Sequence, residues 1–565
     1  MLPCRPLARR CSLPLMNSWF ERLTTLDALF LNLENDRNAH MHVGAVALFE
    51  GPAPAYRDLL QLIESKLERV PRYRQRLMFV PFGQGRPVWI DETQFDLEFH
   101  VRHTALPAPG GVDELEKLAG RLFSQRLDRD KPLWEIWLVE GLADGGFALI
   151  SKTHHCMIDG VAGIDLAAVL MELSPDAEKP PPAAHWEPRP APKVSELLAR
   201  SVTDQLAHPL RFLRDAVQSA SGETSEPRQI LKELVAGALP LLSFAGQGQA
   251  PPSSLNVPIG PHRRFSMTTF SLAEVKAVRA HLGGTVNDVV LACVAGGLRS
   301  YLLARGESVG PDLRAMVPVS MRAPGARGQL GNQVSAIFCS LPVGDPSAAS
   351  RLKKVSAEMK GLKESGQAMG AHALTRLSDF APPTLMAQAA RLQSVTRFFN
   401  LVVTNVPGPQ FPLYLLGRKM LACHPQIPLA ALQALVVGLL SYDGQICVGL
   451  TGDADAARDL DSLSRALRAA LDELLVAAGQ PLHPAPLHPP PPEPARPTAT
   501  APTPAPALVA PPPPAQAVTQ PSLHAVTQPL ARAAAPAQPP SNGPGPSAQP
   551  PDLLHTNDST QAKRS

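Results

Sequence analysis

Cysteine is scarce in this sequence and follows no pairing pattern. The seven cysteines are scattered along the chain, and no CxxC pair occurs among them. An odd number without such spacing argues against a disulfide framework and against a structural zinc site, and it favours a reducing compartment. The sequence also lacks an uncharged apolar run of about 18 residues, so we predict no transmembrane helix. Arginines interrupt the first 20 residues where a signal peptide needs its apolar run.

A strong net charge is absent as well. The 53 lysines and arginines nearly balance the 50 aspartates and glutamates, which leaves a formal net charge of +3. Proteins that bind nucleic acid mainly through phosphate contacts carry a marked basic excess. We therefore expect no nucleic-acid partner.

Proline divides the chain into regions that can fold and a region that cannot. Of the 62 prolines, 25 lie between Pro481 and Ser565, and this density opposes both helices and sheets. We expect residues 480–565 to be a disordered Pro/Ala-rich tail and residues 1–15 a disordered leader, with Met16 as an alternative start. Residues 16–175 and 264–479 read as two α/β halves, and residues 176–263 as a partly helical crossover between them.

The end of the first half carries the sharpest pattern. Two strands, Trp134–Leu142 and Phe147–Thr153, are joined by a Gly-containing turn that predicts a hairpin. The sequence His-His-Cys-Met-Ile-Asp-Gly follows at residues 154–160, and helical spacing resumes over Val161–Leu173. An imidazole at the end of a strand has rigid support, and its usual pKa near 6.5 suits proton abstraction at neutral pH. A metal-binding pair or two ordinary turn histidines remain alternatives, although Cys156 beside His155 is badly placed to share one zinc ion.

Several sequence blocks together resemble one family. The HHCMIDG segment matches the HHxxxDG motif of acyl-CoA-dependent acyltransferases, and its surroundings resemble the bacterial bifunctional wax ester synthase/diacylglycerol acyltransferase family. The matching blocks occur in family order from about Met16 to Ala478: LTTLDALFLNLE, HMHVGAVALFEG, PLW at 132–134, TVNDVVLACVAGGLRSYL, VPVSMR, GNQVSAIFCSLPV and VTNVPGP.

The resemblance implies a fold and a mechanism. The fold class is α/β, with two chloramphenicol-acetyltransferase-like halves and the active site between them. His155, the second motif histidine, is the expected general base. His154 is expected to support local packing, and Asp159 to pair with an arginine, for which Arg322 is a weak candidate. The resemblance requires no covalent intermediate, which agrees with the lack of a GxSxG nucleophile elbow.

The other blocks supply further candidate residues, each with a structural alternative. Asn287 is expected to stabilise an oxyanion and Asp288 to fix the local loop, whereas helix capping is the alternative for both. Pro132, Leu133 and Trp134 are candidate substrate contacts, although a proline-bounded strand start with a core tryptophan is the stronger explanation. Gly160 is included among the substrate-binding positions because it permits unusual backbone angles at the motif turn.

The expected activity is transfer of a fatty acyl group from acyl-CoA to diacylglycerol or a long-chain alcohol, without a metal and with acyl-CoA as substrate rather than cofactor. A condensation-type or polyketide-associated acyltransferase and a catalytically silent lipid-surface scaffold are the alternatives. The expected location is cytoplasmic, with peripheral contact to the inner membrane or lipid bodies. Two apolar segments with basic residues, at 230–246 and 382–403, suit either such contact or internal packing.

Overall fold

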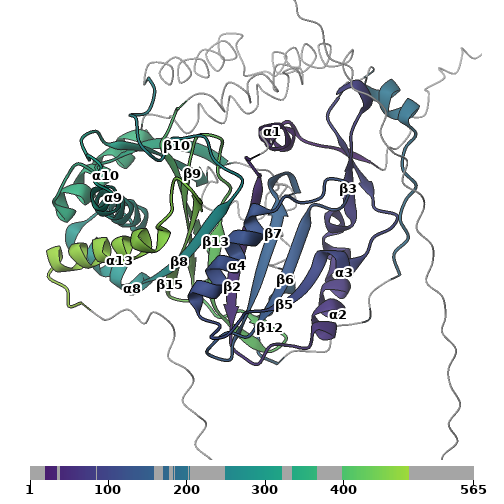
Figure 1. Ribbon diagram of the computed structural model, residues 1–565, viewed down its shortest axis with the longest axis horizontal. Coiled ribbons are helices and arrows are strands. Elements are labelled where there is room, and N and C mark those ends of the chain that lie inside the picture. Colours follow the sequence, from purple (N-terminus) through teal and green to yellow (C-terminus); the bar gives the residue numbers. More distant parts are fainter. Residues whose placement is uncertain are drawn as a thin grey trace, which may run out of the picture. The chain divides into compact units, whose positions relative to one another are not determined.

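The computed structural model of the chain describes residues 20–34, 38–83, 85–157, 169–176, 182, 185–201, 203, 248–320, 334–364 and 397–482. The described strands form two six-stranded sheets and one three-stranded sheet (Figure 1). The expected leader, most of the expected crossover and nearly all of the expected tail lie outside the described residues. Within the crossover, residues 194–201 are helical.

The first sheet has the strand order β12-β13-β2-β7-β6-β5. Its strands are β2 (His42–Phe49), β5 (Val101–Ala105), β6 (Trp134–Glu140), β7 (Phe147–His154), β12 (Tyr414–Leu415) and β13 (Arg418–Gln426). Strands β6 and β7 form the predicted antiparallel hairpin. Its turn contains Gly145 at φ 77°, a backbone angle that glycine adopts without steric cost.

Both faces of this sheet are buried. Phe147 and Leu149 of β7 pack on one face with helix α2 (Tyr56–Lys66), whereas Ala148 and Ile150 pack on the other face with α4 (Val112–Ser124). A strand covered on both sides needs apolar residues at successive positions. This explains why the sequence FALI is continuous rather than alternating. The short helix α3 (Leu97–His100) leads directly into β5.

Strand β13 connects the two halves of the sequence. It comes from the C-terminal half of the chain, yet it pairs antiparallel with β2, with Gln426 opposite Gly44. The first sheet is therefore completed by strands from the second half, and the two halves are interlocked. The sequence analysis did not predict this strand.

The second sheet has the order β10-β9-β11-β14-β15-β8. Its strands are β8 (Arg263–Ser271), β9 (Leu313–Ser320), β10 (Val334–Leu341), β11 (Leu401–Pro407), β14 (Leu435–Tyr442) and β15 (Gln445–Asp453). Four helices gather on one side of this sheet: α8 (Leu272–Leu282), α9 (Val286–Ala304), α10 (Ala348–Glu364) and α13 (Leu460–Ala477) (Figure 1). The pairs β14–β15 and β15–β8 are antiparallel, whereas β11 runs parallel to β14 and to β9.

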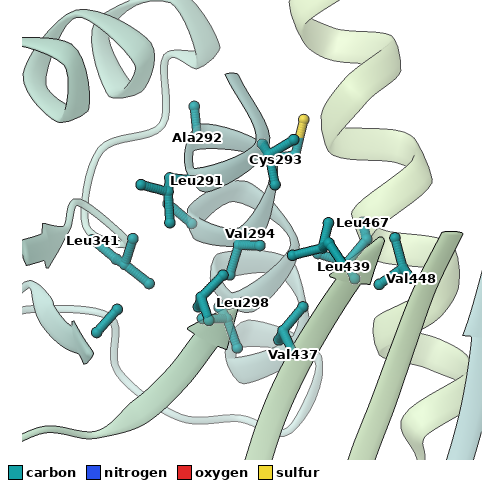
Figure 2. Packing of buried hydrophobic residues seen from close by; sticks show 14 of the residues in the cluster. Leu291, Ala292, Cys293, Val294, Leu298, Leu341, Val437, Leu439, Val448 and Leu467 are labelled. Atoms are coloured by element: carbon teal, nitrogen blue, oxygen red, sulfur yellow. The ribbon is translucent and has the colours of Figure 1, made fainter. Parts of the chain in front are cut away.

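Helix α9 is the centre of the second core. Leu291, Val294 and Leu298 are buried among residues from β14, β15 and α13 (Figure 2). By length and composition alone α9 is apolar enough to cross a membrane, but 72% of its apolar window is buried inside the protein. A helix that is apolar on all sides is expected in the core of a large protein. We therefore assign α9 to the core.

A small sheet of order β1-β4-β3 supports the start of the first half. Its strands are β1 (Glu21–Arg22), β3 (Gln75–Met78) and β4 (Val88–Asp91). Helix α1 (Thr25–Leu33) begins immediately after β1, and Thr24 caps it by accepting a hydrogen bond from the Asp27 backbone N–H. The small sheet therefore fixes where α1 starts.

One sequence expectation needs correction here. The helix expected to run to Leu173 ends earlier in its described part, because residue 171 is not helical and Glu172 forms a β-bridge with Tyr414. For the segment 382–403, which suited either membrane contact or internal packing, the last residues Leu401–Val403 are buried in β11. Internal packing is thus their role, whereas residues 230–246 and 382–396 lie outside the described residues.

Candidate active site

His155 stands directly after strand β7, at the first position of the 3₁₀ turn η4 (His155–Met157). Its backbone N–H donates a hydrogen bond to the Met41 carbonyl at 2.8 Å. This bond ties the residue to the segment that leads into β2. The backbone of His155 is therefore held independently of its ring.

The His155 ring lies against helix α1. It stacks on Phe30, with ring centroids 3.8 Å apart and planes inclined by 23°. Its Nδ1 atom is buried and reaches hydrogen-bond geometry with no atom in the described part of the chain. The Nε2 atom is not completely buried, and it also has no hydrogen-bond partner in the described part of the chain. Nε2 is therefore the nitrogen that remains available for proton transfer.

Burial lowers the pKa of His155 to about 4, and the neighbouring His154 adds to the shift, while the residue's own backbone opposes it. An imidazolium in this position would lose hydration without gaining an anionic partner. The ring is consequently neutral at pH 7. A neutral imidazole is the form that can accept a proton.

His154 has a different environment. Its side chain is 1% exposed, and its Nδ1 atom accepts a hydrogen bond from the Cys156 backbone N–H at 3.1 Å. Because a backbone N–H can only donate, Nδ1 is the accepting nitrogen, and Nε2 faces a Glu34 carboxylate oxygen at 3.6 Å. Both nitrogens are directed at protein groups. This geometry supports packing and not proton transfer to a substrate.

Cys156 is unsuited to act as a nucleophile. It is buried, and its sulfur lies 2.9 Å from Nδ1 of His154. Burial raises the pKa of the thiol well above its usual value. Since the thiolate is the reactive species, the cysteine inside the motif stays inert.

Glu34 is a residue that the sequence analysis quoted within a block but gave no role. It ends helix α1 as a buried carboxylate, with one oxygen 3.4 Å from His42 Nε2 and the other accepting from Arg129 Nε at 3.0 Å. Burial alone would raise its pKa, but the facing imidazoles of His154 and His42 outweigh this and hold the pKa well below its usual range. The charged Glu34 therefore links α1 to both strands that carry the histidines.

We expect Glu34→Gln to destabilise the protein more than it slows the reaction. The change keeps the side-chain shape and removes the charge that holds Arg129 and faces two imidazoles. Hydrogen bonds to charged groups contribute about 1.5–3 kcal/mol each, so the free energy of unfolding should fall by about that much. Turnover should fall less than about tenfold, because Glu34 reaches His155 only through its neighbour. Chemical denaturation and turnover on one preparation give both values.

Glu21→Gln is the matched control, because Glu21 also pairs with an arginine, Arg72, but is 61% exposed. An exposed pair of this kind contributes at most about 1 kcal/mol. Equal losses of stability in the two variants would contradict a buried structural role for Glu34.

The PLW residues lie in the protein interior. Leu133 and Trp134 are buried, and the indole N–H of Trp134 donates to the Tyr73 carbonyl at 2.8 Å. The indole also stacks on His100, with centroids 4.6 Å apart. The Leu133 carbonyl accepts from the His154 backbone N–H at 2.9 Å, and Pro132 is buried beside it. This arrangement matches the strand-start alternative, in which these residues position β7 and the motif histidines.

Asn287 and Asp288 lie in the first turn of α9 rather than before it. Thr285 is the N-cap, and its backbone N–H donates to Asp288 Oδ2 at 2.9 Å in a reciprocal capping box. Ser356 of α10 also donates to that oxygen, at 3.2 Å. The capping alternative therefore applies to Asp288. It does not apply to Asn287, whose Oδ1 accepts instead from Asn405 Nδ2 at 3.3 Å.

Both motif regions adjoin one cluster that joins the halves. This cluster contains Met41 from the first half together with Val402 and Val436 from β11 and β14, and Phe30 packs against it. His155 contacts two of these residues, Phe30 and Met41. Asn405, which contacts Asn287, lies three residues beyond Val402 on the same strand. No direct contact between His155 and Asn287 links the motifs among the described residues, and the shared cluster is their connection.

The predicted Asp159 and Gly160 lie outside the described residues, as does Arg322. The expected pairing of Asp159 with an arginine thus stays a prediction. Within the described residues, no group of three or more His, Cys, Asp or Glu side chains is arranged to hold a metal ion.

Several buried histidines make stability depend on pH. Burial lowers the pKa of His40, His100 and His155 to about 4 and that of His42 to about 3. The unfolded chain takes up these protons near pH 6.5, whereas the folded chain does not, so stability is lost as pH falls from about 6.5 towards 4. Glu116 acts oppositely, because burial raises its pKa to about 7.

Between pH 6 and 5 we therefore expect the unfolded chain to bind about three more protons than the folded chain. The free energy of unfolding should then fall by at most about 4 kcal/mol for each unit by which the pH is lowered. Urea denaturation at pH 7.5, 6 and 5 measures the slope. Replacing His185, which is exposed, by Gln should leave the slope unchanged. A stability that is flat from pH 7 to 5 would contradict the assignment of these histidines as neutral buried groups.

Comparison with known families agrees with the motif geometry. Residues 23–290 match the wax ester synthase/diacylglycerol acyltransferase catalytic domain, and residues 330–475 match the C-terminal domain of the same family. Curated relatives cover the same part of the chain. A putative diacylglycerol O-acyltransferase of Mycobacterium bovis is 35% identical over 458 residues, which is 80% of this chain and 95% of the relative. The chain belongs to the wax ester synthase/diacylglycerol acyltransferase family.

Further similarities support the fold and the enzyme class. A probable diacylglycerol O-acyltransferase of Mycobacterium tuberculosis is 34% identical over 459 residues, covering 80% of this chain and 98% of the relative. The solved structure of the wax ester synthase/diacylglycerol acyltransferase from Marinobacter aquaeolei VT8 is 30% identical, with a TM-score of 0.58, and covers 81% of this chain and 100% of that chain. The predicted fold class with two chloramphenicol-acetyltransferase-like halves is confirmed.

The predicted enzyme class is confirmed too, because membership of this family makes the chain an O-acyltransferase acting on diacylglycerol or a long-chain alcohol. The condensation-type and silent-scaffold alternatives are disfavoured by the same matches. Sequence reasoning missed the individual roles of Glu34, Phe30 and Asn405. Each lies inside or next to a block that carries the family resemblance, which was the signal available for them.

Proposed function

We propose that His155 is the general base of a direct acyl transfer from acyl-CoA to diacylglycerol or a long-chain alcohol. The observation that carries this proposal is the His155 ring itself, which is neutral and stacked on Phe30, and neither of its nitrogens is engaged by a described residue. His154 and Cys156 beside it are occupied by internal contacts.

The reaction balances without a covalent enzyme intermediate. Nε2 of His155 accepts the proton from the hydroxyl group of the acceptor alcohol, while the oxygen of that hydroxyl group attacks the thioester carbonyl. The tetrahedral intermediate then collapses, the carbon–sulfur bond breaks, and the imidazolium returns the proton to the departing CoA thiolate. Acyl-CoA is consumed as a substrate, and we propose that no further cofactor takes part.

The low pKa of His155 in the free enzyme is compatible with this role. Burial penalises the imidazolium, but the negative charge that develops on the carbonyl oxygen during attack favours it. Proton transfer and formation of the oxyanion therefore assist each other. The amide of Asn287 is the proposed donor to that oxyanion.

The proposal is tested with purified protein and palmitoyl-CoA, offered hexadecanol and dioleoylglycerol in separate reactions. We expect ester product from at least one acceptor, together with an equal amount of released CoA. Release of CoA at the same rate without either acceptor would identify a thioesterase instead. We propose a cytoplasmic location, with contact to the lipid surface that holds the acceptor.

A further inference from the structure

The connection between β3 and β4 exposes two aromatic side chains. Phe82 is 88% exposed and Phe79 is 47% exposed, whereas Val80 between them is buried. We call the segment from Phe79 to Phe82 the aromatic tip. Exposing two phenylalanines in one short connection is costly in water, and such apolar features usually mark an interaction surface.

The backbone of the aromatic tip is unusual as well. Phe82 has φ 59° and ψ 14°, which is the left-handed region. A bulky aromatic residue seldom adopts this conformation, since the Cβ atom then crowds the backbone. Strain of this kind costs about 1–3 kcal/mol and persists where the surroundings hold it or function uses it. Here it presents an aromatic ring to solvent.

Arginines lie beside the aromatic tip, and the exposed Glu21 next to them pairs with Arg72. Arg22 and Arg86 lie at the same end of the small sheet, and Arg22 donates to the Arg86 carbonyl at 3.1 Å. The sequence from Leu77 to Ile90 contains no acidic residue. The carboxylates of Asp91 and Glu92 follow at the opposite end of β4, where each pairs with an arginine.

The small sheet also connects this surface to the active site. Arg86 donates to Thr25 Oγ1 at 2.8 Å, and the Leu23 N–H donates to the Pro87 carbonyl at 2.9 Å. Phe30, which stacks on His155, lies five residues beyond Thr25, or about 7.5 Å along the axis of α1. A surface that contacts the aromatic tip therefore lies near the helix that supports the general base.

We propose that the aromatic tip docks the enzyme on a lipid–water surface that carries anionic headgroups, with Phe79 and Phe82 inserted among the acyl chains. Exposed aromatic rings beside arginines match the apolar and the anionic layer of such a surface. The inference rests on the proposed function, because diacylglycerol and long-chain alcohols dissolve in that phase. Docking places the acceptor hydroxyl, which lies at the interface, close to α1.

The test uses the full chain and its Phe79→Ser/Phe82→Ser variant. Flotation with vesicles of phosphatidylcholine and phosphatidylglycerol in a 7:3 ratio measures binding (a composition chosen to be roughly one-third anionic). The variant should bind about 10- to 100-fold more weakly, the loss expected when one or two phenylalanine rings no longer enter an apolar phase. Wild-type binding should also weaken with pure phosphatidylcholine or with added salt.

Leu303→Ser/Val476→Ser is the matched control. These side chains are 47% and 62% exposed and come from the ends of α9 and α13 in the second half. The control should bind vesicles like the wild type. Thermal denaturation should be unchanged in both variants, because neither removes a buried group.

Activity separates docking from chemistry. With palmitoyl-CoA, the aromatic-tip variant should lose turnover on dioleoylglycerol held in vesicles but keep it on a soluble short-chain alcohol. Equal vesicle binding by the variant and the wild type would overturn the docking proposal. If the variant changed only the oligomeric state of the protein and not its vesicle binding, the tip would be a contact between copies of the chain instead. Tip-dependent vesicle binding by a protein that esterifies neither acceptor would uphold docking and overturn the proposed function.

Discussion

His155→Ala should lower the rate of acyl transfer by about 100- to 10,000-fold, the usual cost of removing a general base. The fold should survive, because the backbone N–H of His155 still donates to the Met41 carbonyl. The lost stack on Phe30 accounts for about 0.5–1.5 kcal/mol of stability. Turnover with palmitoyl-CoA, measured well below the thermal midpoint of each protein, isolates the catalytic effect.

His154→Ala provides the contrasting result. It removes the acceptor of the Cys156 N–H and the imidazole that faces Glu34. Leaving such buried groups unpaired costs about 1–3 kcal/mol each, so this variant should lose more stability and less activity than His155→Ala. A well-folded His155→Ala protein with near wild-type turnover would refute the assignment. The reverse ranking of the two variants would transfer the role of base to His154.

Several helices, strands and turns can be predicted from the sequence because neighbouring residues specify them. The apolar spacing of Leu272–Leu282 predicts a helix, and α8 has the same bounds. The sequence Tyr442-Asp443-Gly444 predicts a hairpin turn, and at this turn between β14 and β15 both Asp443 and Gly444 have positive φ. The strand–turn placement of the HHxxxDG motif was likewise correct, since β7 ends at His154.

Strand β13 was missed because its pattern is not apolar. Met420, Ala422, His424 and Gln426 alternate as buried positions, but two of them are polar, and Pro425 within the strand argues against a strand at the sequence level. Its burial comes from pairing with β2, more than 370 positions away in the sequence. No window of neighbouring residues carries that information. The same holds for Glu34, whose partners Arg129 and His154 lie far along the chain.

The capping geometry of α9 bears on the two interpretations of the ND motif, helix capping and oxyanion stabilisation. Because Thr285 is the N-cap and Asp288 completes the capping box, Asn287 is not needed to cap α9. Its Oδ1 atom accepts from Asn405, so the NH₂ group of the Asn287 amide points away from Asn405. Within the described residues that group has no acceptor. This agrees with the proposed role of Asn287 as a hydrogen-bond donor to a developing oxyanion.

Asn287→Ala should lower turnover by about 100- to 1,000-fold, the cost of losing one oxyanion donor. The apparent KM for palmitoyl-CoA should change little, because the hydrogen bond strengthens only as charge develops on the carbonyl oxygen. The thermal midpoint should stay near that of the wild type. Steady-state kinetics and thermal denaturation on the same preparation separate these effects.

Thr285→Ala is the matched control for Asn287→Ala, since it removes the cap itself and should cost about 0.5–2 kcal/mol of stability with little effect on turnover. The loss of turnover in Asn405→Ala should lie between those of the other two variants, because this change leaves the Asn287 amide in place but no longer orients it. Unchanged turnover together with a lowered thermal midpoint in Asn287→Ala would assign this residue to the stability of α9. A rate loss that is large in Asn287→Ala, smaller in Asn405→Ala and absent in Thr285→Ala is the order that an oxyanion donor held by its neighbour requires.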